Sequence, residues 1–359
     1  MKVKLEDVCN CGSSNLKQSD VMDISGDYPI YGAAGIIGTV DFYHQEKPYV
    51  AVVKDGAGIG RTTLHPAKSS VIGTMQYLLP KENIMPEYLY YIVRYMHLEK
   101  YFTGTTIPHI YFKDYKNEGF NLDSLERQVE IVNILGKCER IIDARQQELQ
   151  KLDNLIKARF VEMFGNQSHN EKSLPYMTID DVAEIYLGIT HTPTYVDSGV
   201  MFISAKNTSR DFLDLSDVKY ISREEFEGAP KGSKPQVNDV LFSRVGSNLG
   251  HPVILEEELE LCTFVSLGFL RSKGITTSNY LKHWMRDEFF AKQVSEHVKG
   301  VGQPNLNTGW LKEFKIIVPD LEKQKEFDDF CKQVDKSKVV DINIIPEGGF
   351  YYGDKFFIS

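Results

Sequence analysis

A glycine-rich stretch from Asp55 to Gly60 has the composition of a nucleotide-binding loop that could hold a cofactor such as S-adenosylmethionine. A loop of this kind should open a helix, but Pro66 follows closely and disfavours a helix there. A related stretch, Gly246 to Gly250, keeps only the two outer glycines. Turns therefore explain both stretches better than cofactor binding does, and the chain has no Asn-Pro-Pro-Tyr type motif for amino methylation.

Three further sets of reactive side chains lack the partners that catalysis or metal binding requires. Cys9 and Cys11 form a pair with no second pair and no histidine at zinc-finger spacing. Pro319-Asp320 with Glu322-Lys323 resembles a nuclease motif, but its carboxylates are too close together and lie at a strand-to-helix junction. The histidines without an evident serine or cysteine partner are His191, His251 and His283. We therefore expect no catalytic residue, metal site or cofactor site in this chain, and no Walker-type loop for ATP is present.

Lysine and arginine side chains gather around both glycine-rich stretches. Between His44 and Lys68, and again between Gly228 and His251, basic residues exceed acidic residues by two. Lys and Arg are the usual partners of DNA phosphates, and Arg, Lys, Asn and Gln are the usual readers of base edges. A solvated, mildly basic surface would explain any single residue equally well, but recurrence around two related loops favours contact with DNA.

The predicted DNA-contacting residues fall in two pairs of loops. From the glycine-rich stretches and their surroundings they are Lys54, Arg61, Lys68, Lys231, Lys234, Arg244, Ser247 and Asn248. From a second pair of related loops, around Pro108 and Pro304, they are His109, Tyr111, Lys113 and Asn305, for which fixing the turn is an equally good role. We expect Arg244 to bind either a guanine edge or a phosphate, and Lys54 to contact phosphate.

These loops recur because the chain contains an internal repeat. Gly104 to Gln128 and Gly300 to Gln324 share glycine, proline, leucine, glutamate and glutamine positions 196 residues apart. Earlier matches follow in the same order at smaller offsets, for example Leu5 to Val8 with Ile179 to Val182. A period this long indicates two related domains, each with its own core, and is too long for a solenoid.

Between the two copies lies a segment with the pattern of a long helix. From Asp123 to Phe164 it has no proline and one glycine, Gly136, and Gly165 follows as a helix C-cap. The seam that recurs in steps of three and four, as in a coiled coil, consists of Ile131, Leu135, Cys138, Ile142, Arg145, Leu149, Leu152 and Ile156. We expect one continuous helix over residues 124 to 164, about 60 Å long at ~1.5 Å per residue. The alternative is an internal helix of a larger core.

A second, shorter helix should follow the second copy. Phe327, Cys331 and Val334 match the start of the seam, after which Lys338 and then Pro346 end the pattern. We expect the two helices to pack together, with Leu135 in contact with the second helix. The last three seam residues, Leu149, Leu152 and Ile156, would then need another chain to cover them, either a different subunit or a second copy of this one.

The sequence thus predicts an α/β protein with two globular domains, each followed by a coiled-coil helix, the first long and the second short. The predicted boundaries are residues 1–122 for the first domain, 123–165 for the long helix, 166–319 for the second domain, 320–341 for the short helix and 342–359 for an irregular tail.

Composition restricts where and how such a protein works. The chain has 359 residues, of which 42% are hydrophobic, with neither an apolar run that could span a membrane nor a signal peptide after Met1. Its five cysteines lack framework spacing, which fits a reducing cytoplasm. The net charge of −9, to which Glu256 to Glu260 contributes, argues against a free-standing nucleic-acid-binding protein.

Two globular domains, each followed by a helix, resemble the specificity subunit of type I restriction–modification systems. The resemblance covers Met1 to about Val340, and its most specific segments are GTTIPHI, SLERQVEIVNIL, VPDLEKQ and LIKARFVEMFG. It implies a non-catalytic subunit whose domains each recognise one half of a split DNA sequence. In that family the helices act as a spacer and as a dock for modification subunits. The short second helix departs from the family pattern.

The resemblance also implies partners and cofactors. The partners would be double-stranded DNA, modification (methyltransferase) subunits and a restriction subunit, with self-association through an uncovered seam as a further option and no membrane contact. S-adenosylmethionine, ATP and Mg would be bound only by the partner subunits. A non-catalytic coiled-coil scaffold with two protein-binding domains is the alternative, although it leaves the basic loops at related positions unexplained.

Overall fold

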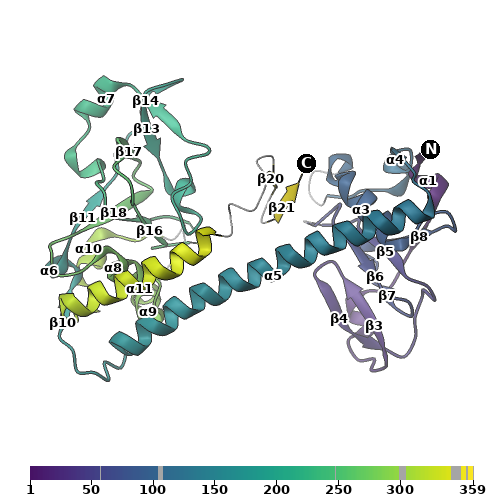
Figure 1. The fold of residues 1–359 in the computed structure, drawn as a ribbon, viewed down its shortest axis with the longest axis horizontal. Helices are drawn as coiled ribbons and strands as arrows, with labels where there is room; N and C mark the ends of the chain where they lie inside the picture. Colours follow the sequence, from purple (N-terminus) through teal and green to yellow (C-terminus); the bar gives the residue numbers. More distant parts are fainter. Residues whose placement is uncertain are drawn as a thin grey trace. The chain divides into compact units, whose positions relative to one another are not determined.

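The chain folds into two compact units, Met1–Ala144 and Arg145–Ser359, in a computed structural model (Figure 1). The structure describes residues 1–56, 58–103, 108–246, 248–298, 305–340, 349–352 and 355–358. Each unit is described by itself below.

The first unit consists of small β-sheets, short helices and the first part of a long helix. Its strands are β1 (Lys2–Lys4), β2 (Cys9–Ser13), β3 (Tyr28–Gly32), β4 (Gly35–Val40), β5 (Tyr49–Val53), β6 (Thr62–His65), β7 (Ser70–Val71), β8 (Met75–Pro80) and β9 (Gly119–Asn121). Its helices are α1 (Leu5–Val8), α2 (Gln18–Val21), α3 (Pro86–Tyr95), the 3-10 helix η1 (Leu98–Tyr101), α4 (Phe112–Tyr115) and the start of α5 (Leu125–Phe164).

The second unit combines the rest of α5 with a larger set of strands and helices. Its strands are β10 (Tyr176–Thr178), β11 (Ala183–Leu187), β12 (Tyr195–Val196), β13 (Val200–Ile203), β14 (Lys219–Ile221), β15 (Val240–Ser243), β16 (Pro252–Ile254), β17 (Leu261–Thr263), β18 (Leu267–Ser272), β19 (Lys315–Ile317), β20 (Gly349–Tyr352) and β21 (Lys355–Ile358). Its helices are α6 (Ile179–Val182), η2 (Ala205–Thr208), α7 (Arg223–Gly228), η3 (Lys231–Ser233), α8 (Ser278–Met285), α9 (Glu288–His297), α10 (Thr308–Glu313) and α11 (Leu321–Val340).

The two units repeat one sheet topology. A four-stranded antiparallel sheet has the order β2-β8-β5-β6 in the first unit and β11-β18-β15-β16 in the second. Its inner strand β5 is buried at every residue, as expected of a continuous apolar run covered on both faces. Each unit also contains a parallel strand pair, β3 with β7 and β13 with β17. The prediction of two related α/β domains is therefore confirmed.

A repeated glutamine fastens each domain to the helix that follows it. Gln128 accepts a hydrogen bond from the Met85 amide (2.9 Å) and donates to the carbonyls of Asn83 and Asp123 (both 3.0 Å). The side chains of Gln128 and of its counterpart Gln324 are fully buried. In each unit three backbone groups therefore depend on one glutamine side chain for their hydrogen bonds.

Gln324 repeats this arrangement in the second unit. It accepts from the Thr277 amide (2.9 Å) and donates to the carbonyls of Ile275 (3.1 Å) and Pro319 (2.8 Å). The shared glutamine positions in the sequence repeat thus mark one structural latch used twice.

Helix α5 is continuous over forty residues, as the sequence predicts. Ser124 caps its start, because its Oγ accepts from the Arg127 amide (3.3 Å). Gly165 ends it with a φ of +79°, the left-handed conformation that a C-cap favours. Ion pairs at spacing i,i+3, such as Arg145 with Glu148 (2.7 Å) and Arg159 with Glu162 (2.8 Å), add support along the helix.

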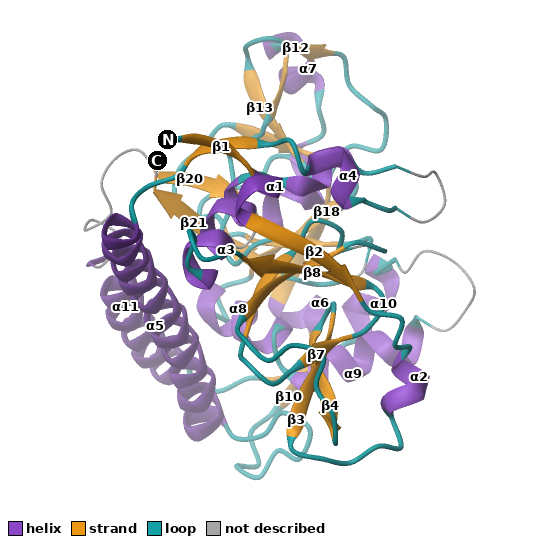
Figure 2. Cartoon of the chain, turned by 90° about the vertical axis from the view of Figure 1, so that its right-hand side faces the viewer, coloured by secondary structure: helices purple, strands orange, loops and turns teal. Residues whose placement is uncertain are grey.

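Helix α11 packs on the second half of α5, and the two run antiparallel (Figures 1 and 2). Near one end the Phe327 ring contacts Phe160 and Phe164, with centroids 5.4 and 5.5 Å apart. Near the other end Lys338 pairs with Asp153 at 2.7 Å. The expected register, which sets α11 against Leu135 in the first half of α5, is therefore replaced, because a seam of apolar residues does not specify the direction of its partner helix.

The antiparallel direction also changes what covers the end of the seam. Ile156 is only 4% exposed and belongs to the core of the second unit, Leu152 packs against that core, and Leu149 is half-buried. The prediction that these residues need another chain to cover them is wrong for Ile156 and Leu152, because α11 and the second unit cover them.

The described part of the tail also differs from the prediction. Strands β20 and β21 pair antiparallel from Gly349 with Ile358 to Tyr352 with Lys355, where an irregular segment was expected. The aromatic and β-branched residues that interrupt the heptad pattern there are also residues that favour strands.

No helix in the described part of the chain is both long and apolar enough to cross a membrane. Nor do the described residues bring together three or more His, Cys, Asp or Glu side chains in a way that could hold a metal ion.

Candidate nucleic-acid interface

The first glycine-rich stretch forms a tight turn between the antiparallel strands β5 and β6. The Gly60 amide donates to the Val53 carbonyl (2.9 Å), and Gly56 and Gly60 have φ values of +91° and +80°. Only glycine adopts such angles readily, and a Cβ on Gly60 would lie 2.6 Å from the backbone nitrogen of Glu99. The interpretation as a turn is confirmed, since the stretch joins two strands.

The second glycine-rich stretch forms the same turn between β15 and β16. The Gly250 amide donates to the Ser243 carbonyl (2.7 Å), and Gly246 and Gly250 have φ values of +92° and +73°. The outer glycines recur because the turn needs both left-handed positions, whereas the positions between them are free to differ.

In the first unit the second repeated loop lies against this turn. The Gly56 amide donates to the Pro108 carbonyl (3.0 Å), and the Ile110 amide donates to the Lys54 carbonyl (2.9 Å). Side chains reinforce the contact, because His109 Nδ1 lies 2.5 Å from Asp55 Oδ1. The glycine-rich loop and the loop around Pro108, which are separate in the sequence, thus form one surface.

The second unit joins the corresponding loops through different side chains. The Leu306 amide donates to the Arg244 carbonyl (2.8 Å), and Val245 forms a β-bridge with Asn305. Arg244 Nη2 donates to Asn305 Oδ1 (3.4 Å). The backbone arrangement is therefore shared between the units, while the side chains that close it are not.

Exposed aromatic and basic side chains gather on the first unit's loop pair. The rings of His109 and Tyr111 lie nearly parallel, with an interplanar angle of 20° and centroids 6.4 Å apart, and Lys113 Nζ lies 5.2 Å from the Tyr111 centroid. Tyr111 is 49% exposed, so the group presents a ring face and a cation to solvent. Such groups can bind phosphates and stack on bases.

The other predicted residues of the first unit lie around this loop pair. Arg61 is exposed and donates from Nη1 to the Ala33 carbonyl (3.0 Å), which directs its guanidinium toward the β3–β4 connection. Lys54 is half-buried, and its amide donates to the Thr74 carbonyl (2.9 Å). Lys68 is exposed at a φ of +55° in the connection between β6 and β7. All three leave the ammonium or part of the guanidinium free to meet phosphate.

Arg244 has a different environment from the one expected of a base-reading residue. It is only 9% exposed, and its guanidinium also donates to the carbonyls of Leu306 (3.2 Å) and Val265 (3.0 Å). Burial lowers the pKa of its guanidinium. Because three of its donors are already used inside the unit, Arg244 fastens the two loops together and is poorly placed to grip a guanine edge.

The remaining residues predicted in the second unit are partly engaged elsewhere. Lys234 Nζ donates to the Glu227 carbonyl (3.3 Å) and lies 4.5 Å from the Phe226 ring centroid, so α7 holds it. Lys231 and Asn248 are exposed, and Asn305 is exposed although its Oδ1 accepts from Arg244. Ser247 lies outside the described residues.

An ion pair at the start of β15 stabilises the second loop pair. Sequence reasoning did not identify it. Arg271 on β18 binds Asp239 through Nε (2.9 Å) and Nη2 (2.7 Å), and Asp239 is 2% exposed. The hydrogen bonds to Asp239 raise the pKa of Arg271. The pair fixes the start of β15, the strand that leads into the turn, but its members are far apart in sequence and share no motif. Asp55 was likewise missed, although it adjoins the glycines, because its partner His109 comes from another loop.

Comparisons with known proteins connect this architecture to one family. The model of the type I restriction modification DNA specificity domain matches residues 1–154 and again residues 174–343. The specificity subunit of type I restriction enzyme MjaVIII from Methanocaldococcus jannaschii is 22% identical over 313 residues, which cover 80% of this chain and 72% of that protein. The crystal structure of the type I restriction–modification S subunit from M. genitalium superposes with a TM-score of 0.57 at 15% identity, covering 96% of this chain and 93% of that chain, which shows a common fold.

Proposed function

Because this chain belongs to the type I restriction modification DNA specificity family, we propose that it is the DNA-recognition subunit of a type I restriction–modification complex. Each globular domain reads one half of a split DNA site. The observation that carries the proposal is the loop pair, which each unit builds on the same backbone turn and presents with different exposed side chains. A shared frame with variable side chains is what two readers of unlike half-sites require.

The exposed side chains divide into two roles. Lys54, Arg61, Lys68 and Lys231 are placed to contact phosphates and set the register of the protein on DNA. The candidates for reading bases in the first unit are His109, Tyr111 and Lys113, and in the second unit they are Asn248 and Asn305, because amide and imidazole groups match base edges.

The chain itself is proposed to be non-catalytic. Modification subunits would supply methylation with S-adenosylmethionine, and a restriction subunit would supply ATP- and Mg-dependent cleavage, all in the cytoplasm. The net charge of −9 supports this division, since a chain with this balance needs partners to provide most phosphate contacts.

The helices are proposed to separate the domains and to dock modification subunits. Ile134 and Ile141, which are 57% and 68% exposed, lie seven residues apart and so on one face of α5. Burying both against a modification subunit would contribute about 3–6 kcal/mol. Self-association through Leu149, Leu152 and Ile156 is not proposed, because the chain itself covers Leu152 and Ile156 and leaves Leu149 only half-exposed.

The proposal is tested by reconstituting the chain with its modification subunit and methylating a DNA library that is randomised at two half-sites. The proposal predicts that methylated DNA carries two short conserved blocks separated by a fixed spacer, and that the chain alone binds DNA weakly. Methylation without such a bipartite preference, or with the same preference when this chain is left out, would contradict it.

A further inference from the structure

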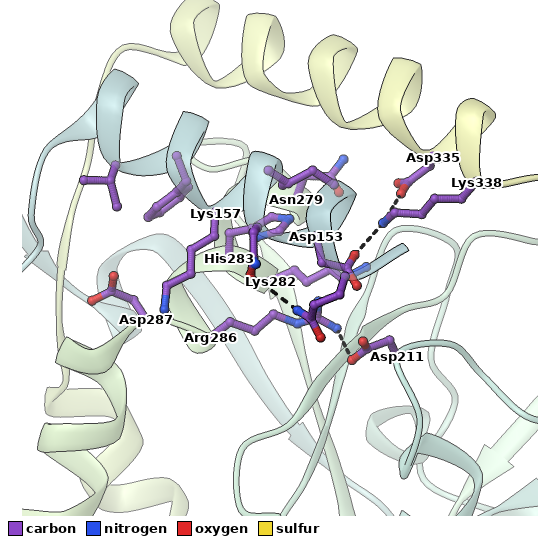
Figure 3. A pocket seen from close by; sticks show the side chains of 15 residues that line it. Asp153, Lys157, Asp211, Asn279, Lys282, His283, Arg286, Asp287, Asp335 and Lys338 are labelled. Atoms are coloured by element: carbon purple, nitrogen blue, oxygen red, sulfur yellow. Dashed lines mark hydrogen bonds and ion pairs between the residues drawn. The ribbon is translucent and has the colours of Figure 1, made fainter. Parts of the chain in front are cut away.

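A polar cavity of about 260 Å³ lies in the second unit, between α8, α11 and the second half of α5 (Figure 3). Its lining includes four lysine or arginine side chains and four aspartates, so its formal charge is balanced. Phe160 and Ile156 form an apolar part of the wall. The charges are distributed unevenly over this lining.

Three of the aspartates face cations that already belong to the chain. Lys338 Nζ pairs with Asp153 (2.7 Å) and Asp335 (2.8 Å), and Arg286 Nη2 pairs with Asp211 (2.7 Å). The fourth, Asp287, accepts from the Phe289 amide (2.8 Å) and so caps the start of α9. These carboxylates are therefore committed to contacts within the unit.

Two lysines of the lining, Lys157 and Lys282, remain. Among the residues that the structure describes, none forms a hydrogen bond or ion pair with either ammonium; Lys157 lies on the Asp287 side of the cavity, and Lys282 lies beside Arg286 (Figure 3). Burial, and then the neighbouring Arg286, lower the pKa of Lys282. The adjacent His283 is neutral, since burial holds its pKa well below the usual range. Half-burying an unpaired cation beside a second cation costs stability, which a functional role would explain.

The first unit contains a filled version of the same place. At an offset of 192 residues, Lys282, His283 and Arg286 on α8 correspond to Tyr90, Tyr91 and Arg94 on α3, and at an offset of 196 Asp335 on α11 corresponds to Glu139 on α5. In the first unit one carboxylate, that of Glu139 on α5, bridges to α3.

In detail, Glu139 accepts from Tyr91 Oη (2.8 Å) and pairs with Arg94 Nη1 (2.5 Å), which also donates to Tyr90 Oη (2.7 Å). In the second unit Asp335 is drawn to Lys338 instead. The second unit thus keeps the arginine, has Lys282 in place of Tyr90, and lacks a free carboxylate to bridge the two cations.

We propose that this cavity receives one carboxylate side chain of the modification subunit, which pairs with Lys282 beside Arg286 and anchors that subunit to the second unit. The inference rests on the proposed function, because α5 and α11, the helices proposed as the dock, form two walls of the cavity. It adds a specific site and a specific chemistry to that dock. Charge favours protein over DNA, since a single carboxylate brings one negative charge that Lys282 can balance, whereas a phosphate backbone would bring several to a lining whose charges are already balanced.

The test compares Lys282→Met with wild type in the full chain. Methionine keeps the length of the side chain and removes the charge, so the variant should fold with an unchanged or raised Tm. Its affinity for the modification subunit, measured by titration calorimetry without DNA, should fall on the order of 30-fold, the loss expected for truncating one partner of a buried charge pair. The matched control is Lys292→Met, on the exposed face of α9, which should leave both quantities unchanged.

Several results would overturn the inference. Wild-type affinity in Lys282→Met would do so, as would an equal loss in both variants. A fall in Tm that accompanies the lost affinity would make Lys282 a structural residue. Unchanged assembly with a shallower salt dependence of DNA binding by the complex would assign Lys282 to DNA. If the wild-type chain does not bind the modification subunit at all, the proposed function fails first, and that outcome is visible before any variant is made.

Discussion

The two units close the same pair of loops with different chemistry. In the first unit a partly exposed pair, His109 with Asp55, reinforces backbone hydrogen bonds, and its side chains are 38% and 30% exposed. In the second unit the buried Arg244 reaches two carbonyls and Asn305. The backbone frame is therefore what the repeat preserves, and the side chains on it are what each unit can change. That separation suits a protein whose halves must read different sequences.

The largest loss of stability is expected from substitution of the buried glutamine that joins each domain to the helix after it, and the loss should be similar in both units. Replacing Gln128 or Gln324 by Leu removes three hydrogen bonds and leaves buried backbone groups without partners. Each substitution should therefore lower the free energy of unfolding by roughly 3–5 kcal/mol. Denaturant titration of the two variants measures this. A large loss for one and none for the other would show that the latch serves only one unit.

The turns should be next in sensitivity, and their four glycines supply matched controls. Gly60→Ala meets the backbone nitrogen of Glu99 at 2.6 Å and Gly250→Ala meets the buried Phe290 ring at 2.5 Å, so each should cost roughly 2–4 kcal/mol. Gly56→Ala and Gly246→Ala meet nothing within 4 Å and should cost only about 1 kcal/mol of backbone strain. Thermal unfolding of all four variants checks the order. Equal losses of stability would mean that crowding around Gly60 and Gly250 is unimportant.

The side chains that close the loops should differ between the units. Arg244→Ala leaves buried carbonyls without donors and should cost about 2–3 kcal/mol of stability. His109→Ala removes an exposed pair and should cost less than about 1 kcal/mol. If Arg244→Ala left stability unchanged while relaxing base preference in the second half-site, Arg244 would be a base-reading residue after all.

The smallest effect is expected at a single phosphate contact. Lys54→Ala should weaken binding evenly across DNA sequences and lower the slope of log affinity against log salt by about one. The measurement is DNA binding by the reconstituted complex at several salt concentrations, with Lys292→Ala as the control. A change in base preference instead would move Lys54 from the phosphate contacts to the base-reading residues.

The sequence predicts those features of the fold that depend on local pattern. The glycine turns, the continuity of α5 and the repeat of Gln128 at Gln324 all follow from residue types at fixed spacing. The direction of α11 does not, because an apolar seam such as Ile131 to Ile156 packs as well in either direction.

Contacts between segments distant in the sequence explain the remaining differences. The pairing of His109 with Asp55, the burial of Arg244 and the isolation of Lys282 each depend on a neighbour many residues away. Charge and position near a loop suggested that Arg244 is accessible, and only the packed structure shows which acceptors surround it. The site was therefore predictable as a place, but not residue by residue.

The central claim is that each unit reads one half-site, and the most direct measurement compares two variants on one randomised library. Methylation by the complex should be profiled with His109→Ala and, separately, with Asn248→Ala. The account predicts that His109→Ala alters base preference in one half of the site only and Asn248→Ala in the other half only. Altered preference in both halves for either variant, or in the same half for both, would contradict it.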